Sequence, residues 1–397
     1  GQEHESARQI RLSPLYNDLK QSGAVFGSKN GWERPLWFAP KGTEPVDQLD
    51  FLNPGWKKYT AKEHQTVREG VGLIDQSSFS KFEIIGDGAL TLLQRLCVSN
   101  MDKPVGSVIY TQMCNQNGGT EADVTFVRLK ENHFYLITGA GFGVRDSDWI
   151  RRQIRSESSV HIFEVTSGKA VLNIVGPRSR TVLQSVSDTD VSNKFIKFST
   201  AREITIGSAN VLAARIGYVG ELGFELHIPT EYASHVYSVL WDAGRGENIA
   251  NVGYRAIESL RMEKGYLYWS SDITPDYTPL EAGVGFRVHF HSKEDFIGRD
   301  ALEKQSLNGA SKKLCTFTCD SDLSVTGGEA ILFNDRVVSL ATSASYGYSV
   351  KKTILRGYLE KEHWEGVNFS VEVFGERHPI QRVNSPIYDP TNQALKN

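Results

Sequence analysis

Asp123 stands at the mouth of a predicted strand, where a carboxylate could meet a ligand. Residues 110–114, which begin with Tyr110, alternate along a short extended run, and the Asn-Gly-Gly sequence at 117–119 can form a tight turn because glycine adopts positive φ without steric cost. Residues 124–127 then continue as a β-branched and aromatic strand. A carboxylate at this place either faces water at the strand end or contacts a ligand, and this stretch alone leaves both open.

A second acidic position lies among regularly spaced glycines in residues 215–225, RIGYVGELGFE. Glycines let the backbone pass close to another group, and Tyr218 and Glu225 bracket the last two of them. The stretch is either a hairpin with a solvated rim or a wall against a ligand. In the second case a buried carboxylate would suit a ligand with two neighbouring N–H donors on one edge, such as the N3–H and 2-amino group of a pterin. The two carboxylate oxygens can accept two parallel hydrogen bonds from such an edge.

Two further motifs carry weaker signals. The Gly-rich loop at 139–143 follows a strand and precedes a helix, but a dinucleotide fingerprint needs glycine where Val144 stands. His289 and His291 alternate as some metal ligands do. No third ligand is suggested nearby, so we expect an ordinary exposed strand there and no metal site.

The composition is that of an ordinary globular protein. The chain has 397 residues, of which 40% are hydrophobic and 23% charged, and its net charge of −3 makes neither nucleic acid nor an anionic membrane an expected partner. No apolar run approaches the roughly 20 residues of a membrane helix. Four cysteines make no disulfide framework, so we expect Cys315 and Cys319 in the core and a soluble protein in a reducing compartment. The start is unlike a signal or transit peptide, and because it opens at Gly1 we expect a processed chain or part of a longer one.

The order of elements predicts an α+β fold in three parts. Residues 1–55 carry scattered prolines and aromatic side chains and are expected to form an extended strap packed on a domain. Helical patterns, such as the one over residues 254–264, then interleave irregularly with strands, which favours α+β over a doubly wound sheet. After about residue 310, short strands with glycine turns predict a separate β domain.

Several of these stretches, taken in order, resemble one family. They are Tyr110-Thr111, GGTEAD at 118–123, RIGYVGELGFE at 215–225 and YRAIESLRMEKGYLYWSSDITPDYTPLEAGVGF at 254–286, and together they resemble the aminomethyltransferase family of the glycine cleavage T-protein. More closely, nearly all of the chain resembles the C-terminal, tetrahydrofolate-binding half of sarcosine dehydrogenase and dimethylglycine dehydrogenase. The resemblance does not extend to the flavin half of those enzymes.

The resemblance implies a role for six residues. Asp123 matches the family's central carboxylate, beside folate N10 and the one-carbon unit, and is the implied catalytic residue. The implied tetrahydrofolate contacts are Tyr110, Tyr218, Glu225, Arg261 and Tyr268. Of these, Glu225 falls on the pterin edge. The chain departs from the family after the Gly-Gly turn, where Ala122 replaces the first of two adjacent acids.

The resemblance also implies an architecture and an activity. Residues 56–305 would form two interlocked α+β subdomains around a central folate cleft, and residues 306–397 a C-terminal β-barrel-like domain. The activity would be tetrahydrofolate-dependent one-carbon transfer, in which an iminium or formaldehyde-level carbon from a methylated amine such as sarcosine or dimethylglycine gives 5,10-methylenetetrahydrofolate.

Partners and location follow from the same resemblance. The implied partner is a flavin-containing dehydrogenase module, fused or separate. The implied location is the mitochondrial matrix in a eukaryote and the cytoplasm in a bacterium. Two alternatives stay open: a non-catalytic regulatory or scaffold subunit with this fold, and a folate-dependent demethylase.

Overall fold

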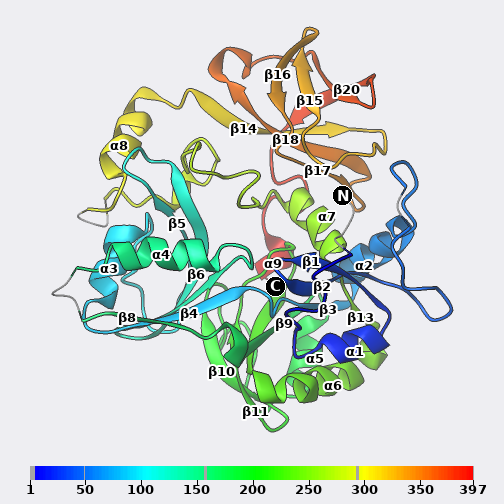
Figure 1. Ribbon diagram of the computed structural model, residues 1–397, viewed down its shortest axis with the longest axis vertical. Coiled ribbons are helices and arrows are strands. Elements are labelled where there is room, and N and C mark those ends of the chain that lie inside the picture. The colour runs from blue at the N-terminus through cyan, green and yellow to red at the C-terminus, as the bar shows by residue number, and fades with distance from the viewer. Residues whose placement is uncertain (1–4, 49, 156–158, 292–294, 397) are drawn as a thin grey trace.

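Three β-sheet units make up most of the molecule, which is a computed structural model describing residues 5–48, 50–155, 159–291 and 295–396. In Figure 1 the C-terminal sheet lies at the top, a five-stranded sheet at the left and a six-stranded sheet below. Helices and strands alternate irregularly along the chain, and nearly all strand pairs are antiparallel, which confirms the predicted α+β class.

The six-stranded sheet carries helices on one face. Its strands, in spatial order, are β10 (Ala201–Ile206), β11 (Ala209–Ala214), β12 (Gly223–Pro229), β9 (Lys169–Val175), β3 (Val71–Asp75) and β13 (Ile249–Asn251). Among the described strands of this sheet, β13 and β3 pair in parallel and the other neighbours are antiparallel. Helices α1 (Tyr16–Gln21), α5 (Ser179–Ser185) and α6 (Ala233–Gly244) pack leucine and valine side chains onto this face and form the largest core cluster.

The five-stranded sheet is built in the same way. Its strands, in spatial order, are β5 (Val108–Cys114), β6 (Thr120–Lys130), β7 (His133–Thr138), β4 (Ser80–Ile85) and β8 (His161–Glu164). Helices α3 (Ala89–Leu96) and α4 (Gly143–Arg152) cover one face with side chains at helical spacing. The other face meets the six-stranded sheet, where the Tyr135 hydroxyl lies 3.1 Å from Nδ1 of His227.

The C-terminal unit is a seven-stranded curled sheet. Its strands, in spatial order, are β16 (Arg336–Leu340), β15 (Ala330–Phe333), β19 (Phe369–Val373), β20 (Glu376–Val383), β14 (Lys312–Cys319), β18 (Lys352–Glu360) and β17 (Ser343–Gly347). Cys315 and Cys319 are buried on β14 around Phe317, in the core as expected, because alternate residues of a strand share one face. Helix α8 (Arg299–Asn308) precedes this sheet, and α9 (Gln393–Lys396) returns to the middle of the molecule (Figure 1).

The N-terminal segment is more regular than the extended strap expected from its prolines. After α1 it forms a hairpin of β1 (Ala24–Lys29) and β2 (Trp32–Phe38), closed by Asn30 and Gly31, which both have positive φ. Asn-Gly is the strongest short hairpin signal, and a proline is tolerated within β2 because this two-stranded sheet consists only of edges. Trp37 is buried beside Tyr59 of α2 (Lys57–Glu69), so the segment packs on the body of the protein as expected.

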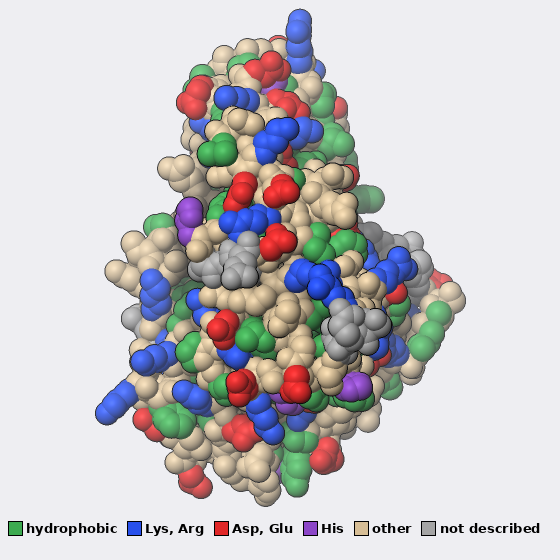
Figure 2. Space-filling view, turned by 90° about the vertical axis from the view of Figure 1, so that its left-hand side faces the viewer, with side chains coloured by type: hydrophobic (Ala, Val, Ile, Leu, Met, Phe, Trp, Pro, Cys, Tyr) green, Lys and Arg blue, Asp and Glu red, His purple; other side chains and the backbone are tan. Residues whose placement is uncertain are grey.

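Helix α7 (Tyr254–Lys264) lies between the six-stranded sheet and the C-terminal sheet, and its bounds agree with the predicted helix. Among the described residues, no helix has the length and apolarity needed to cross a bilayer. Figure 2 shows acidic and basic side chains interspersed over one face of the molecule, in keeping with its small net charge.

Candidate active site

A cavity of about 960 Å³ lies where the three units meet. Strands β5 and β6 supply one wall, β9 and β12 a second, and β14, β18 and β20 a third. Residues 264–269 and the turn around residues 282–287 line the remaining sides. This volume is in the range of small-molecule sites, and such sites favour boundaries between structural units.

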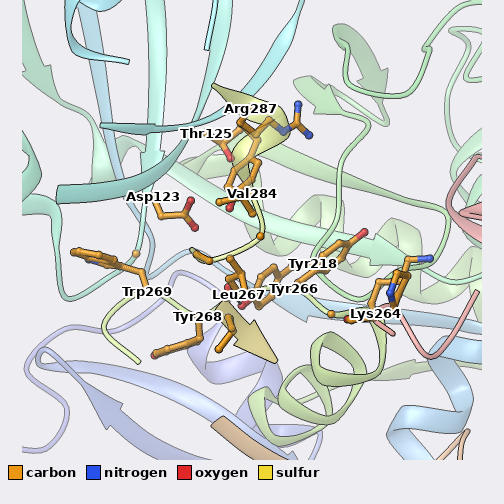
Figure 3. Close-up of a pocket in the computed structure, with 18 of the residues that line it drawn as sticks. Asp123, Thr125, Tyr218, Lys264, Tyr266, Leu267, Tyr268, Trp269, Val284 and Arg287 are labelled. Atoms are coloured by element: carbon orange, nitrogen blue, oxygen red, sulfur yellow. Dashed lines mark hydrogen bonds between the residues drawn. The ribbon is translucent and has the colours of Figure 1, made fainter. Parts of the chain in front are cut away.

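Asp123 projects into the cavity from β6 (Figure 3). Gln112 lies opposite on β5 and donates from Nε2 to Oδ1 of Asp123 at 2.7 Å. Burial raises the pKa of Asp123 to about 6, while hydrogen bonds from Gln112 and Tyr110 oppose that shift. A carboxyl group with a pKa near neutrality can both accept and release a proton at pH 7.

The turn before Asp123 is held by local hydrogen bonds and a close approach. The side chain of Asn115 accepts hydrogen bonds from the backbone N–H groups of Asn117 and Gly119, at 3.0 and 3.1 Å. Gly118 has φ of +82°, and a Cβ at Gly119 would lie 2.0 Å from the carbonyl oxygen of Pro275. The Asn-Gly-Gly sequence therefore fixes where β6 enters the cavity wall.

Glu225 reaches the same cavity from β12, on the opposing sheet. Burial raises the pKa of Glu225 to about 7, and no donor or cation among the described residues contacts its carboxylate. Asn173 pairs with Glu225 across the sheet from β9, and both polar atoms of its buried amide also lack a partner in that part of the chain. Polar groups buried without partners are rare, so this wall is suited to a ligand that brings donors.

Three tyrosines expected at the site also line the cavity: Tyr110, Tyr218 and Tyr268. The Tyr218 hydroxyl donates to the carbonyl oxygen of Leu267, and its ring stacks on Tyr266 with centroids 5.8 Å apart (Figure 3). Burial raises the pKa of Tyr110 well above its usual value, so this hydroxyl stays protonated and acts as a donor beside Asp123.

Arg261 does not line the cavity but lies behind its wall. Its guanidinium is 2.8 Å from the Asp272 carboxylate and donates to Oγ of Ser343 at 2.8 Å, so it joins α7 to the C-terminal sheet. It also contacts Glu258 and approaches the ring of Tyr268, at 5.8 Å from the centroid. Arg261 thus positions the segment carrying Tyr268, and its direct contact with a ligand stays a prediction.

Arg287 is a cavity residue that the sequence reasoning missed. The expected strand containing His289 and His291 does not form; a single 3-10 turn (Gly285–Arg287) precedes an irregular segment there. The glycines at 283 and 285 were the available signal, because they allow a turn where the alternating pattern predicted a strand. This turn directs Arg287 to the cavity beside Tyr110, with its guanidinium carbon 5.3 Å from the ring centroid.

The raised pKa of Glu225 predicts a pH-dependent stability. In the unfolded chain the carboxyl group titrates near 4.5, whereas in the folded protein it titrates near 7. Between these values the unfolded state loses the proton first, so the folded state becomes progressively less stable as pH rises, and the full loss is present above pH 7. Thermal unfolding at pH 5 and pH 8 should therefore show that the wild type loses more stability than Glu225→Gln over this interval. An equal loss in both proteins would contradict the raised pKa.

Comparison with known proteins places this fold and cavity in a family. Residues 15–292 match the GCVT N-terminal domain, and residues 312–389 match the glycine cleavage T-protein C-terminal barrel domain. The crystal structure of glycine cleavage system aminomethyltransferase T from Bartonella henselae superposes with a TM-score of 0.82 at 23% identity, covering 96% of this chain and 98% of that chain. This likeness shows the fold.

Curated relatives extend the likeness in sequence. Mitochondrial sarcosine dehydrogenase from Homo sapiens is 32% identical over 437 residues, covering 98% of this chain and 48% of that protein. The mitochondrial regulatory subunit of pyruvate dehydrogenase phosphatase from Mus musculus is 36% identical over 366 residues, covering 89% and 42%. The chain thus spans about half the length of these relatives. With both T-protein domains matched in order, the chain belongs to the glycine cleavage T-protein family of aminomethyltransferases.

Proposed function

We propose that this chain binds tetrahydrofolate in the cavity and transfers to it a one-carbon unit at the formaldehyde level. The carbon would come from a methylated amine such as sarcosine or dimethylglycine, and the product would be 5,10-methylenetetrahydrofolate. A flavin-containing dehydrogenase module, fused or separate, would supply the oxidised carbon. Relatives named as mitochondrial support the mitochondrial matrix as the location in a eukaryote, and the cytoplasm would be its counterpart in a bacterium.

One observation carries the proposal: two carboxylates from two different sheets face one cavity, and both have a raised pKa. Glu225 lacks a donor among the described residues, so its two oxygens are available to a ligand with two parallel N–H groups. A pterin presents such an edge in its N3–H and 2-amino group. The aromatic rings of Tyr218 and Tyr266 offer apolar surface in the same cavity.

Folate when bound would supply the nucleophilic nitrogens N5 and N10, and this chain's residues would do the rest. Glu225 would anchor the pterin end, which sets the orientation of the ligand and so the distance between reacting atoms. Asp123, with its pKa of about 6, would stabilise the positive charge of an iminium donor and exchange a proton at N10. Tyr110 and Gln112 would hold the Asp123 carboxylate in place.

Substituting Glu225 by glutamine tests the folate site. The side chain keeps its size, but an amide offers one acceptor and presents its own N–H groups to the pterin donors. The affinity for tetrahydrofolate, measured by titration calorimetry, should fall by about 1.5–3 kcal/mol, the range for a charge-assisted hydrogen bond in a desolvated site.

Glu203→Gln is the matched control, because this exposed glutamate lies on β10 of the same sheet. It should leave folate affinity unchanged. Equal affinities of the wild type and Glu225→Gln would refute the assignment of Glu225, and absence of folate binding by the wild type would refute the proposed function.

A regulatory or scaffold role is the second candidate function. It is favoured by the 36% identity to a phosphatase regulatory subunit, which exceeds the 32% identity to sarcosine dehydrogenase. Such a subunit would keep the cavity and could bind folate without turnover. Activity measurements on Asp123 variants, rather than binding alone, separate the two candidates.

A further inference from the structure

The Arg287 side chain lines the cavity. In the part of the chain that the structure describes, no acceptor lies within hydrogen-bonding distance of its guanidinium, and its Nε is buried. Two aromatic rings lie near it: Tyr110 at 5.3 Å and Phe286 at 4.9 Å from the guanidinium carbon to the ring centroids. Burial lowers the pKa of Arg287, while the charges of Tyr110, Asp123 and Tyr266 oppose that shift.

Several cations at or behind the cavity wall are paired with carboxylates. Arg261 and Arg356 share the Asp272 carboxylate, at 2.8 and 3.8 Å, and Lys264 is 2.9 Å from Asp389. Arg34 also lines the cavity and lies over the ring of Tyr254, 3.3 Å from its centroid, and Lys29 and Lys313 line it as well. Arg287 is distinguished by its charge interaction with Asp123, whose pKa it lowers.

The charge near Arg287 is complementary to a zwitterion. Asp123 and Arg287 line the same cavity, and each affects the pKa of the other through its charge. In Figure 3 both side chains lie in the upper part of the close-up, with Tyr268 below. A small molecule with a cationic nitrogen and a carboxylate could place the first at Asp123 and the second at Arg287. A simple methylamine or free formaldehyde would leave the guanidinium unpartnered, which is unfavourable in a partly dry site.

We propose that Arg287 forms a carboxylate subsite of this cavity, so that the one-carbon donor is the iminium form of an N-methylated amino acid, already oxidised by the flavin-containing module, rather than that of a simple amine. The assignment of the donor rests on the proposed function. A guanidinium binds a carboxylate through two parallel N–H groups, which would give the subsite both affinity and orientation. The glutamate carboxylates of folate have the same chemistry and are the alternative source of the bound group.

Arg287→Met tests the subsite, because methionine keeps an unbranched apolar stem and removes the charge. Arg287→Lys keeps the positive charge but removes the planar guanidinium with its two parallel N–H groups. Arg152→Met, which removes an exposed arginine from α4, is the control for net charge. Each protein is titrated calorimetrically with four probes: N,N-dimethylglycine, dimethylamine, tetrahydrofolate, and tetrahydropteroate, which lacks the glutamate.

We expect dimethylglycine to bind the wild type more tightly than dimethylamine does, and Arg287→Met to weaken dimethylglycine alone by about 10- to 100-fold. Arg287→Lys should fall between, and Arg152→Met should match the wild type. If Arg287→Met instead weakens tetrahydrofolate but not tetrahydropteroate, the subsite holds the folate glutamate. If no probe loses affinity in Arg287→Met, the carboxylate subsite is refuted.

The amino-acid titrations are run with and without tetrahydrofolate. Arg287-dependent binding of dimethylglycine by a protein that does not bind folate would refute the proposed function and leave the subsite standing. Folate binding by the wild type, with no loss of affinity for any probe in Arg287→Met, would support the proposed function and refute the subsite.

Discussion

Asp123→Asn is expected to slow the formation of 5,10-methylenetetrahydrofolate by about 10²–10⁴-fold, the range for a positioned acid–base group, while folate affinity stays nearly unchanged. Asparagine has almost the same size as aspartate, so the turn at 117–119 and the hydrogen bond from Gln112 can persist. The negative charge is lost, and with it both the stabilisation of a cationic donor and a proton acceptor near neutrality. The measurement is a formaldehyde-dependent rate with the uncatalysed condensation of formaldehyde and tetrahydrofolate subtracted.

The control for Asp123→Asn is Asp148→Asn, the same chemical change at an exposed position of α4, which should keep the wild-type rate. If the wild type and Asp123→Asn both bind folate but neither exceeds the uncatalysed rate, the regulatory or scaffold role is favoured. If both exceed it equally, Asp123 has no part in the chemistry.

Arg261→Met is expected to lower the free energy of unfolding by about 3 kcal/mol or more, as for other buried ion pairs that lose one member. Asp272 and Arg261 are both buried, and without Arg261 the Asp272 carboxylate would have the more distant Arg356, at 3.8 Å, as its cation, besides the hydrogen bonds that it accepts from Thr342 and the backbone of Tyr268. The contact between α7 and Ser343 would be lost as well. Urea unfolding followed by tryptophan fluorescence provides the measurement.

Arg152→Met is again the matched control, because the pair of Arg152 with Asp148 is exposed and such pairs contribute only about 0–0.5 kcal/mol. A loss of stability no larger than this control would contradict the structural role of Arg261. Folate titration of Arg261→Met, under conditions where it remains folded, then tests the predicted contact between Arg261 and the ligand. An unchanged folate affinity would mean that Arg261 supports the cavity wall and does not contact the ligand.

The sequence predicted elements with a strong local pattern. Helix α7 occurs at the predicted residues because its apolar side chains keep helical spacing over the whole element. The N-terminal hairpin was missed because five prolines outweighed the Asn30-Gly31 turn in the interpretation of residues 1–55.

The convergence of Asp123 and Glu225 on one cavity could be expected only from the family resemblance, because the two residues lie on different sheets and no local pattern relates them. Arg287 and Asn173 were missed for a similar physical reason. Whether a guanidinium or an amide finds a hydrogen-bonding partner depends on the assembled structure, so no spacing of residues along the sequence reveals it. Arg261, by contrast, was recognised by its motif, yet its contacts lie behind the wall.

The assembly of the cavity from three sheets has a consequence for genetic variation. No single unit encloses a ligand, so the cavity keeps its shape only while the seams between the units hold. One seam is the contact between Tyr135 and His227, and another is the bond from the Tyr358 hydroxyl to the backbone of Asp272. A missense change in such a seam would displace one wall relative to the others and impair binding without altering any lining residue. The set of positions at which inherited changes abolish function is therefore larger than the lining of the cavity.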